Sequence, residues 1–142
     1  MMGTAPARQH GVAMQDPRNL LVADHAERLA IATYRHTASF PRAECFGLTS
    51  QMRRAAVSIA SNIAEGCGRR SNRELLPFLS NASGAASELA CQLRIATELG
   101  YGDRSSAEQL HLQVLTLTKM LTRLIRFHNN QPASRQRGPI HE

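Results

Sequence analysis

Aromatic residues are scarce in this 142-residue chain, which has no Trp, two Tyr and four Phe. Ala and Leu supply most of the apolar side chains instead, and both are strong helix formers. The shortage of aromatic rings also argues against a protein that reads single-stranded RNA by stacking bases on exposed rings. The length suits one domain with one buried core.

Long hydrophobic runs are absent too. No segment approaches the roughly 20 apolar residues that a membrane span needs, and residues 1–18 lack the apolar centre of a signal peptide. The three cysteines, Cys45, Cys67 and Cys91, are odd in number and show no C-x-x-C spacing, so we expect reduced thiols. The sequence therefore predicts a soluble cytoplasmic protein without membrane contact.

The motifs that usually accompany catalysis are missing. The chain contains no phosphate-binding G-x-x-x-x-G-K-[ST] loop, no G-x-G-x-x-G turn, no H-E-x-x-H and no G-x-S-x-G elbow. Of its six histidines only His111 stands in E-x-x-H spacing, three residues after Glu108, whereas metal-binding helical bundles use that motif on each of two helices. We therefore expect a protein that is not an enzyme and has no cofactor and no metal site.

What the chain does have is a helical pattern of apolar residues with alternating spacings of four and three. A first helix is expected over residues 19–40 and ends at Pro41. A second begins near residues 41–44 or at Leu48 and ends at Glu65, with Gly66 and Gly68 as left-handed caps. The inward positions of these two helices are Val22, Ala26, Leu29, Thr33, His36, Phe40, Leu48, Met52, Ala55, Ile59 and Ile63.

A third helix is expected to start at the capping box formed by Ser71 and Glu74 and to end at Gly100. A fourth covers residues 105–128. Their inward positions are Leu75, Leu79, Ala82, Ala86, Leu89, Leu93, Ala96, Leu110, Val114, Leu117, Leu121 and Leu124. Because the connections are short, consecutive helices must run antiparallel. The prediction is an all-α, up-down-up-down four-helix bundle over residues 18–130, between flexible tails at 1–17 and 131–142.

The last helix carries more apolar residues than one inward face needs. A second set lies on its other faces: Leu112, Leu115, Ile125 and Phe127. A helix that is apolar on more than one side is buried on more than one side, which favours self-association. The alternative is a broad core stripe in a small bundle.

Small residues dominate the facing halves of the second and third helices, so these two helices should approach closely. Ser58 and Asn62 are expected to form a hydrogen bond across that gap, which fixes the register of the helices. Glu65 is expected to pair with Arg54 or Arg69. Glu88 is expected to pair with an arginine of the second helix or of a neighbouring subunit.

Charge is unbalanced. The chain has 17 Lys and Arg against 11 Asp and Glu, a net charge of +6, and 16 of the 17 are Arg. Five of these arginines fall within 21 residues: Arg53, Arg54, Arg69, Arg70 and Arg73. Because a guanidinium group binds phosphate through two parallel hydrogen bonds, the cluster is a candidate nucleic-acid site. Structural salt bridges or a solvated basic rim are the alternatives.

A longer motif runs through the same region and resembles a bacterial family of four-helix bundles named after proteins encoded in intervening sequences of 23S rRNA genes. The resemblance covers about residues 20–125. The residues that carry it are Gln51, Arg54, Ala55, Ser58, Ile59, Asn62, Ile63, Ala64, Glu65, Gly66, Arg69, Phe78, Leu79, Glu88, Leu89, Leu99, Gly100 and Tyr101. Ala60 and Pro77 depart from the family pattern.

The resemblance implies a homopentameric ring. It extends to the accessory variability proteins of diversity-generating retroelements, which are similar rings that present a basic surface to nucleic acid and to a reverse transcriptase. Our first hypothesis is therefore a non-enzymatic, ring-forming bundle that binds structured RNA or DNA through the five arginines. The second is a protein-interaction scaffold or accessory subunit that does not bind nucleic acid.

Overall fold

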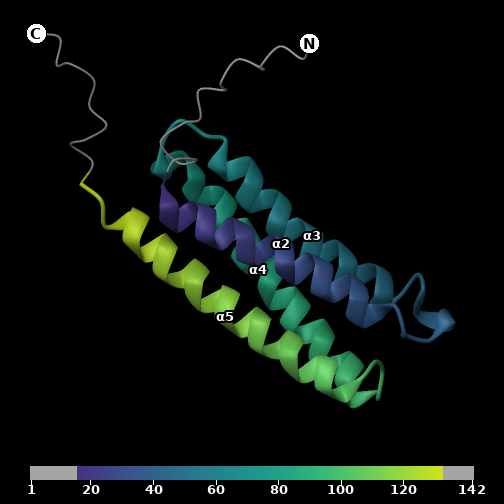
Figure 1. The fold of residues 1–142 in the computed structure, drawn as a ribbon. Helices are drawn as coiled ribbons and strands as arrows, with labels where there is room; N and C mark the ends of the chain where they lie inside the picture. The colour runs from purple at the N-terminus through teal and green to yellow at the C-terminus, as the bar shows by residue number, and fades with distance from the viewer. Residues whose placement is uncertain (1–15, 133–142) are drawn as a thin grey trace, which may run out of the picture.

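The computed structural model describes residues 16–132, and within that range it contains helices and no strands. The four long helices are α2 (Pro17–Thr37), α3 (Leu48–Cys67), α4 (Asn72–Glu98) and α5 (Arg104–Asn129), with a short 3₁₀ helix, η1 (Arg42–Glu44), before α3. Consecutive helices run antiparallel, so that α2 begins beside the end of α5 (Figure 1). The predicted up-down-up-down bundle is confirmed.

The first helix begins at the very edge of the expected N-terminal tail. Asp16 caps α2 by accepting a hydrogen bond from the backbone N–H of Arg18 at 2.9 Å, and Pro17 occupies the first helical position. These two residues therefore belong to the folded unit. The remainder of that tail, residues 1–15, and most of the expected C-terminal tail, residues 133–142, lie outside the described residues.

The first helix also ends earlier than its apolar stripe suggested. It stops at Thr37, and the backbone N–H of Phe40 bonds to the carbonyl of Thr37 at 3.1 Å in a turn. This turn carries the Phe40 ring into the bundle, 5.4 Å from the His36 ring and 5.6 Å from that of Tyr101. Phe40 is thus buried as predicted, although it lies outside the helix.

The two glycines at the end of α3 do not act as predicted. Gly66 is a buried residue inside α3, and the cap residue Gly68 has a φ of −78°, which is not left-handed. Positive φ values among the described residues occur at Gly100 (77°) and Gly102 (79°). Gly100 ends α4 as expected, since the N–H of Tyr101 bonds to the carbonyl of Ala96 at 2.9 Å in a Schellman arrangement.

Only one of the two hydrogen bonds of the predicted capping box forms at the start of α4. Ser71 Oγ accepts a hydrogen bond from the N–H of Glu74 at 3.2 Å, as predicted. The Glu74 carboxylate, however, accepts its bond from the N–H of Arg70 at 3.1 Å rather than from that of Ser71. Glu74 therefore ties the turn before the helix to the helix itself.

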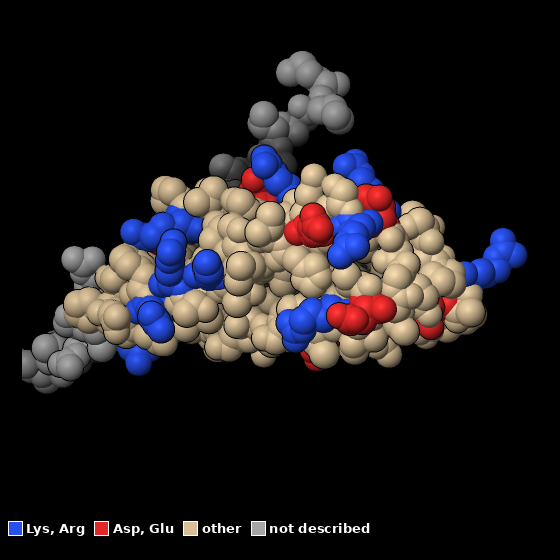
Figure 2. Space-filling model, turned by 90° about the horizontal axis from the view of Figure 1, so that it is seen from below, with Lys and Arg blue, Asp and Glu red and all other residues tan. Residues whose placement is uncertain are grey.

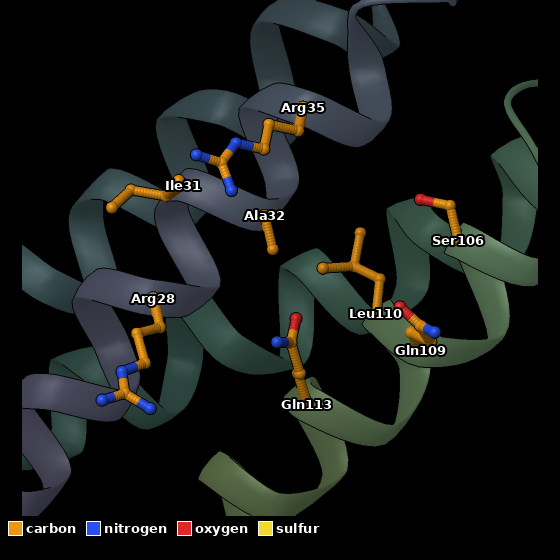
Figure 3. A pocket seen from close by; sticks show the side chains of 8 residues that line it. All are labelled: Arg28, Ile31, Ala32, Arg35, Ser106, Gln109, Leu110 and Gln113. Atoms are coloured by element: carbon orange, nitrogen blue, oxygen red, sulfur yellow. The ribbon is translucent and has the colours of Figure 1, made fainter.

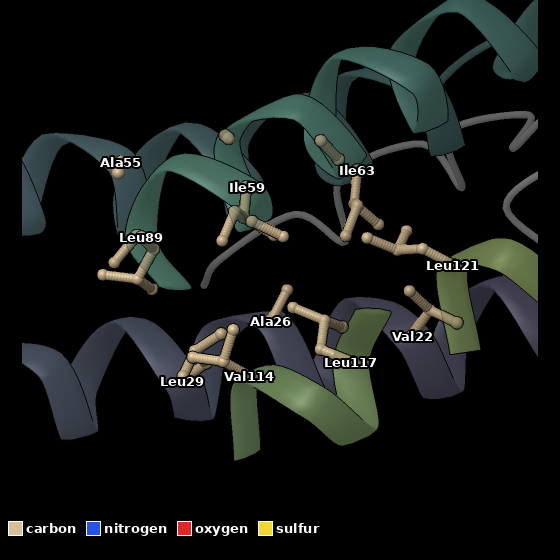
Figure 4. Close-up of a cluster of buried hydrophobic side chains, with 14 of the residues drawn as sticks. Val22, Ala26, Leu29, Ala55, Ile59, Ile63, Leu89, Val114, Leu117 and Leu121 are labelled. Carbon is tan, nitrogen blue, oxygen red and sulfur yellow. The ribbon is translucent and has the colours of Figure 1, made fainter. Parts of the chain in front are cut away.

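The core follows the predicted spacing closely. Every inward position predicted from the four stripes is buried, apart from Leu48, which is half-buried at the first residue of α3. Figure 4 shows side chains from all four helices meeting along the axis of the bundle. The helices are not equally close to one another. The tightest packing joins α3 and α4, and the loosest joins α2 and α5.

Gly66 is the residue on which the α3–α4 approach depends most directly. A methyl group at this position would lie 2.8 Å from Phe78 Cβ and closer still to Leu75 Cδ1. The Leu75 side chain is fully buried, and Phe78 Cβ is fixed to the backbone of α4, so neither can move aside easily.

We predict that Gly66→Ala lowers the free energy of unfolding by about 1–3 kcal/mol, measured as the shift of the urea midpoint at constant protein concentration. Gly84→Ala is the matched control, because a methyl group there meets nothing within 4 Å. In the middle of α4 it should instead raise stability by roughly 0.5–1 kcal/mol. Equal effects of the two substitutions would contradict a close approach at Gly66.

Candidate nucleic-acid interface

The five arginines singled out in the sequence do not form one patch. Arg53 and Arg54 lie near the start of α3, whereas Arg69, Arg70 and Arg73 lie after its end and at the start of α4. Fifteen residues of mostly helical chain separate Arg54 from Arg69, which corresponds to about 22 Å. The two groups therefore belong to opposite ends of the bundle.

Arg53 is engaged in packing α3 against α2. Its Nε donates a hydrogen bond to Thr37 Oγ1 at 2.9 Å, and its terminal nitrogen donates to the Tyr34 carbonyl at 3.3 Å. The guanidinium group also lies 4.6 Å from the centre of the Tyr34 ring. Arg54 is exposed and has no ion pair among residues 16–132.

In the second group, two of the three guanidinium groups form no ion pair with the described residues. Arg69 pairs with Glu65 at 3.5 Å and lies 4.6 Å above the Phe78 ring. Arg70 and Arg73 are exposed, and the described residues place no carboxylate within ion-pair distance of either guanidinium group. Two unpaired guanidinium groups thus stand at the α3–α4 turn.

Arginines of α2 and α5 lie at the same end of the bundle as Arg70 and Arg73, and the sequence analysis did not include them in the candidate site. Because α5 ends and α2 begins at the same end of the bundle as the α3–α4 turn, that end also receives Arg123 and Arg126 from α5 and Arg18 from α2. Figure 2 shows blue side chains gathered without red ones at the end where α5 ends. The predicted topology could have identified them, because an up-down-up-down order places the last turns of the second and fourth helices at the same end of the bundle.

We call this region the basic end, defined by Arg18, Arg69, Arg70, Arg73, Arg123 and Arg126. The carboxylates nearest to it in the chain are already engaged. Asp16 pairs with Arg18 at 3.1 Å, Glu65 pairs with Arg69, and Glu74 accepts the Arg70 N–H. The four remaining guanidinium groups are available for an external anion.

A chain of buried polar side chains holds three helices together beneath the basic end. His128 Nε2 lies 2.9 Å from Asn19 Oδ1, and Asn19 Nδ2 donates to Asn72 Oδ1 at 3.0 Å. Asn72 Nδ2 in turn donates to the Asp16 carboxylate at 3.4 Å. Since Asn19 presents an oxygen, His128 donates from Nε2. The network fixes the spacing of α2, α4 and α5, and therefore of the arginines they carry.

The predicted structural polar residues behave differently from expectation. Asn62 Nδ2 donates to the carbonyl of Ser58 at 2.8 Å and lies 3.2 Å from Ser58 Oγ, so the bond stays within α3 and does not cross to α4. The interhelical prediction was wrong because an Asn side chain reaches the carbonyl one turn back more easily than a neighbouring helix.

The two acids are exposed rather than buried. Glu65 pairs with Arg69, one of its two predicted partners, and not with Arg54, which lies three turns away in α3. Glu88 is exposed on α4, and no arginine among residues 16–132 lies within ion-pair distance of it. Its expected pairing with α3 is absent there, and pairing with a neighbouring subunit stays a prediction.

Other kinds of site find little support in the described part of the chain. No group of three or more His, Cys, Asp or Glu side chains is arranged there to hold a metal ion. None of its helices has the length and hydropathy needed to span a membrane. Cys45 and Cys91 are exposed and Cys67 is buried, all three as free thiols.

The fold and its charged end define a four-helix bundle with a basic surface at one end. The particular family is shown by comparison: residues 18–123 match the 23S rRNA-intervening sequence protein family, and the chain belongs to that family. No curated protein gives a significant match.

Among solved structures, the chain resembles a protein of unknown function from the S23 ribosomal protein family of Bacteroides thetaiotaomicron. The TM-score is 0.67 at 21% sequence identity, covering 77% of this chain and 98% of that one. At this identity the likeness concerns the fold.

Two histidines, His36 and His128, are buried, and their pKa values are lowered. Burial lowers the pKa of His128, although the Asp16 carboxylate opposes the shift and Arg18 adds to it. Burial also lowers the pKa of His36 at the opposite end, where Asp103 opposes the shift and His111 adds to it. His36 Nδ1 lies 2.9 Å from Ser106 Oγ. Both rings therefore fold in their neutral form.

We predict that stability falls as the pH drops below about 6.5, the pKa of an unperturbed histidine. Below that value the unfolded chain binds more protons than the folded one, so each histidine contributes a slope of up to about 1.4 kcal/mol per pH unit. Urea unfolding of His36→Gln/His128→Gln between pH 7 and pH 5 should show a shallower dependence than the wild type. An unchanged slope would contradict the burial of neutral histidines.

Proposed function

We propose that this protein is a non-enzymatic, self-assembling bundle whose basic end binds the phosphates of nucleic acid. The observation that carries the proposal is the convergence of six arginines from α2, the α3–α4 turn, α4 and α5 at one end, with their neighbouring carboxylates already engaged. Such a surface attracts polyanions over a distance and contacts the backbone without reading base sequence.

The guanidinium groups, rather than the helix dipoles, supply the positive charge. Two helix N-termini and two C-termini share the basic end, so their partial charges largely offset one another. The arginine fork matches two phosphate oxygens at once. The name of the family refers to an intervening sequence of 23S rRNA, which makes structured RNA the first nucleic acid to test.

We predict that labelled structured RNA binds the full-length protein and that binding weakens as salt rises. If about six phosphates are contacted, the affinity should fall about 10³-fold between about 50 and 200 mM salt. Fluorescence anisotropy of structured RNA, duplex DNA and an RNA–DNA hybrid measures the affinity and the salt slope.

The decisive variant is Arg70→Glu/Arg73→Glu/Arg126→Glu, which should abolish binding. Its matched control, Arg42→Glu/Arg54→Glu/Arg94→Glu, changes the charge equally at exposed arginines outside the basic end and should retain most of the affinity. Loss of binding in the control alone would place the site on the Arg54 side. An absence of binding at low salt would overturn the nucleic-acid role.

Self-assembly is supported by apolar side chains that the bundle leaves uncovered. Of the surplus set predicted on α5, Ile125 packs against the core and Phe127 lies beneath the Arg18 guanidinium at 3.7 Å. Leu112 and Leu115 face outward, with 64% and 50% of their surface exposed.

Most large exposed apolar residues lie in the half of the bundle away from the basic end: Ile31, Tyr34, Phe46, Ile95, Leu99, Leu112 and Leu115. A contact between copies through that half would leave the basic ends free. The family resemblance suggests five copies in a ring.

We predict that Leu112→Glu/Leu115→Glu reduces the assembly to smaller species, because buried glutamates would face one another without partners. Sedimentation velocity at several protein concentrations measures the mass. Leu20→Glu/Leu21→Glu, two exposed leucines near the basic end, is the control and should assemble like the wild type. A monomeric wild type would rule out the ring.

One observation favours the scaffold alternative. Phe46, in the turn between η1 and α3, has 95% of its surface exposed, and exposed aromatic residues often anchor protein contacts. A protein partner, such as the reverse transcriptase implied by the family resemblance, would be retained in a pull-down after nuclease treatment. It would be lost with Phe46→Ser while RNA binding persisted.

A further inference from the structure

A pocket of about 450 Å³ opens between α2 and α5, in the half of the bundle away from the basic end (Figure 3). It lies along the loosest seam of the bundle. The side chains at the base of this seam are Ala32 from α2 and Leu110 from α5. Its volume falls within the usual range for small-molecule sites, roughly 300–1,000 Å³.

The α2 wall of the pocket is cationic. It carries Arg28 and Arg35, which lie two helical turns, or about 10.5 Å, apart along α2. Arg28 pairs with Asp24 at 3.2 Å, but both side chains are more than half exposed, and such surface pairs are weak. Arg35 has no ion pair among the described residues, so its guanidinium group is available to an anion.

The α5 wall is polar and uncharged. Gln109 and Gln113 lie one turn apart, and each amide offers both donors and an acceptor. Ser106 stands beside them, with its hydroxyl held 2.9 Å from His36 Nδ1. In Figure 3, Leu110 and Gln113 reach from α5 towards α2, Ala32 points towards α5, and the Arg35 guanidinium group lies over α2, turned away from α5.

We propose that this pocket binds a nucleoside monophosphate unit. Arg35, assisted by Arg28, takes the phosphate through its two-pronged donors. The glutamine amides pair with the edge of the base, because amides match the mixed donors and acceptors of every nucleobase. The apolar surface open to the flat ring comes from Ala32 and Ile31, above the buried Leu110. A phosphate alone would leave both glutamines unused, and a nucleoside alone would leave the arginines unused.

The unit can come from two sources, a free nucleotide or one residue of a single-stranded chain, and both present the same chemistry. The pocket shares no residue with the basic end, so this proposal does not depend on the proposed nucleic-acid site. Ile31 lines the pocket and also belongs to the apolar half through which copies are proposed to join.

The test is isothermal titration of the full-length protein with AMP, GMP, CMP and UMP, and separately with the four nucleosides and with inorganic phosphate. At least one nucleotide should bind at one site per chain, and more tightly than its nucleoside or phosphate. Arg35→Gln and Gln113→Leu should each weaken that binding about tenfold or more. Arg94→Gln, which removes an exposed arginine of α4 outside the pocket, should leave it unchanged.

The proposal is overturned if no nucleotide binds, if phosphate alone binds as tightly, or if Arg35→Gln and Arg94→Gln have equal effects. Competition with a short single-stranded oligonucleotide identifies the source. Displacement of the nucleotide supports a strand residue, and an absence of displacement supports a free nucleotide. The charge-reversed basic-end variant should still bind nucleotide, and Arg35→Gln should still bind structured RNA, which separates the two proposals.

Discussion

The close approach of α3 and α4 is the constraint from which the remaining geometry follows. It requires small residues along both helices, and Gly66 sits where Leu75 and Phe78 leave no room for a methyl group. In a four-helix bundle this seam lies opposite the seam between α2 and α5. Packing is loosest along that opposite seam, and Ala32 and the glutamines of α5 line the pocket that lies there.

The buried core could be predicted from the sequence, whereas the contacts at the close approach of α3 and α4 could not. The alternating four–three spacing defines a buried stripe on each helix, so the core and the topology were predictable nearly residue by residue. The roles of individual small and polar residues were not. Gly66 was read as a helix stop, because sequence shows that glycine permits a left-handed cap but not that a neighbouring helix occupies the space of its side chain. The Ser58–Asn62 bond was read as interhelical for a similar reason, since a helical spacing of four serves both arrangements.

The candidate site was predictable only in part, because a linear cluster of arginines is not a spatial one. Arg53 and Arg70 are close in the sequence, yet one binds Thr37 and Tyr34 while the other stands free at the opposite end. Arg126 is far from Arg70 in the sequence but shares its end of the bundle. A spatial cluster of arginines can therefore be predicted only after the topology has been established, because the topology decides which arginines share one end of the bundle. Hydrogen bonds such as His128 to Asn19, which set the spacing of the helices beneath the arginines, depend on side-chain directions that no linear pattern contains.

The separation of basic and apolar surfaces gives a physical reason for assembly and polyanion binding to occur together. One basic end offers four uncommitted guanidinium groups, which is a weak surface at physiological salt because each phosphate contact is screened. In an assembly of copies joined through their apolar halves, several basic ends would be held at fixed positions relative to one another. Once one end is bound, the others would meet the same nucleic acid at a high effective concentration, which multiplies affinity without any new contact. Because only the assembled form gains this advantage, nucleic acid would in turn stabilise the assembly. The two proposed functions would then depend on one another through mass action, although no residue of the basic end would need to lie at the contact between copies.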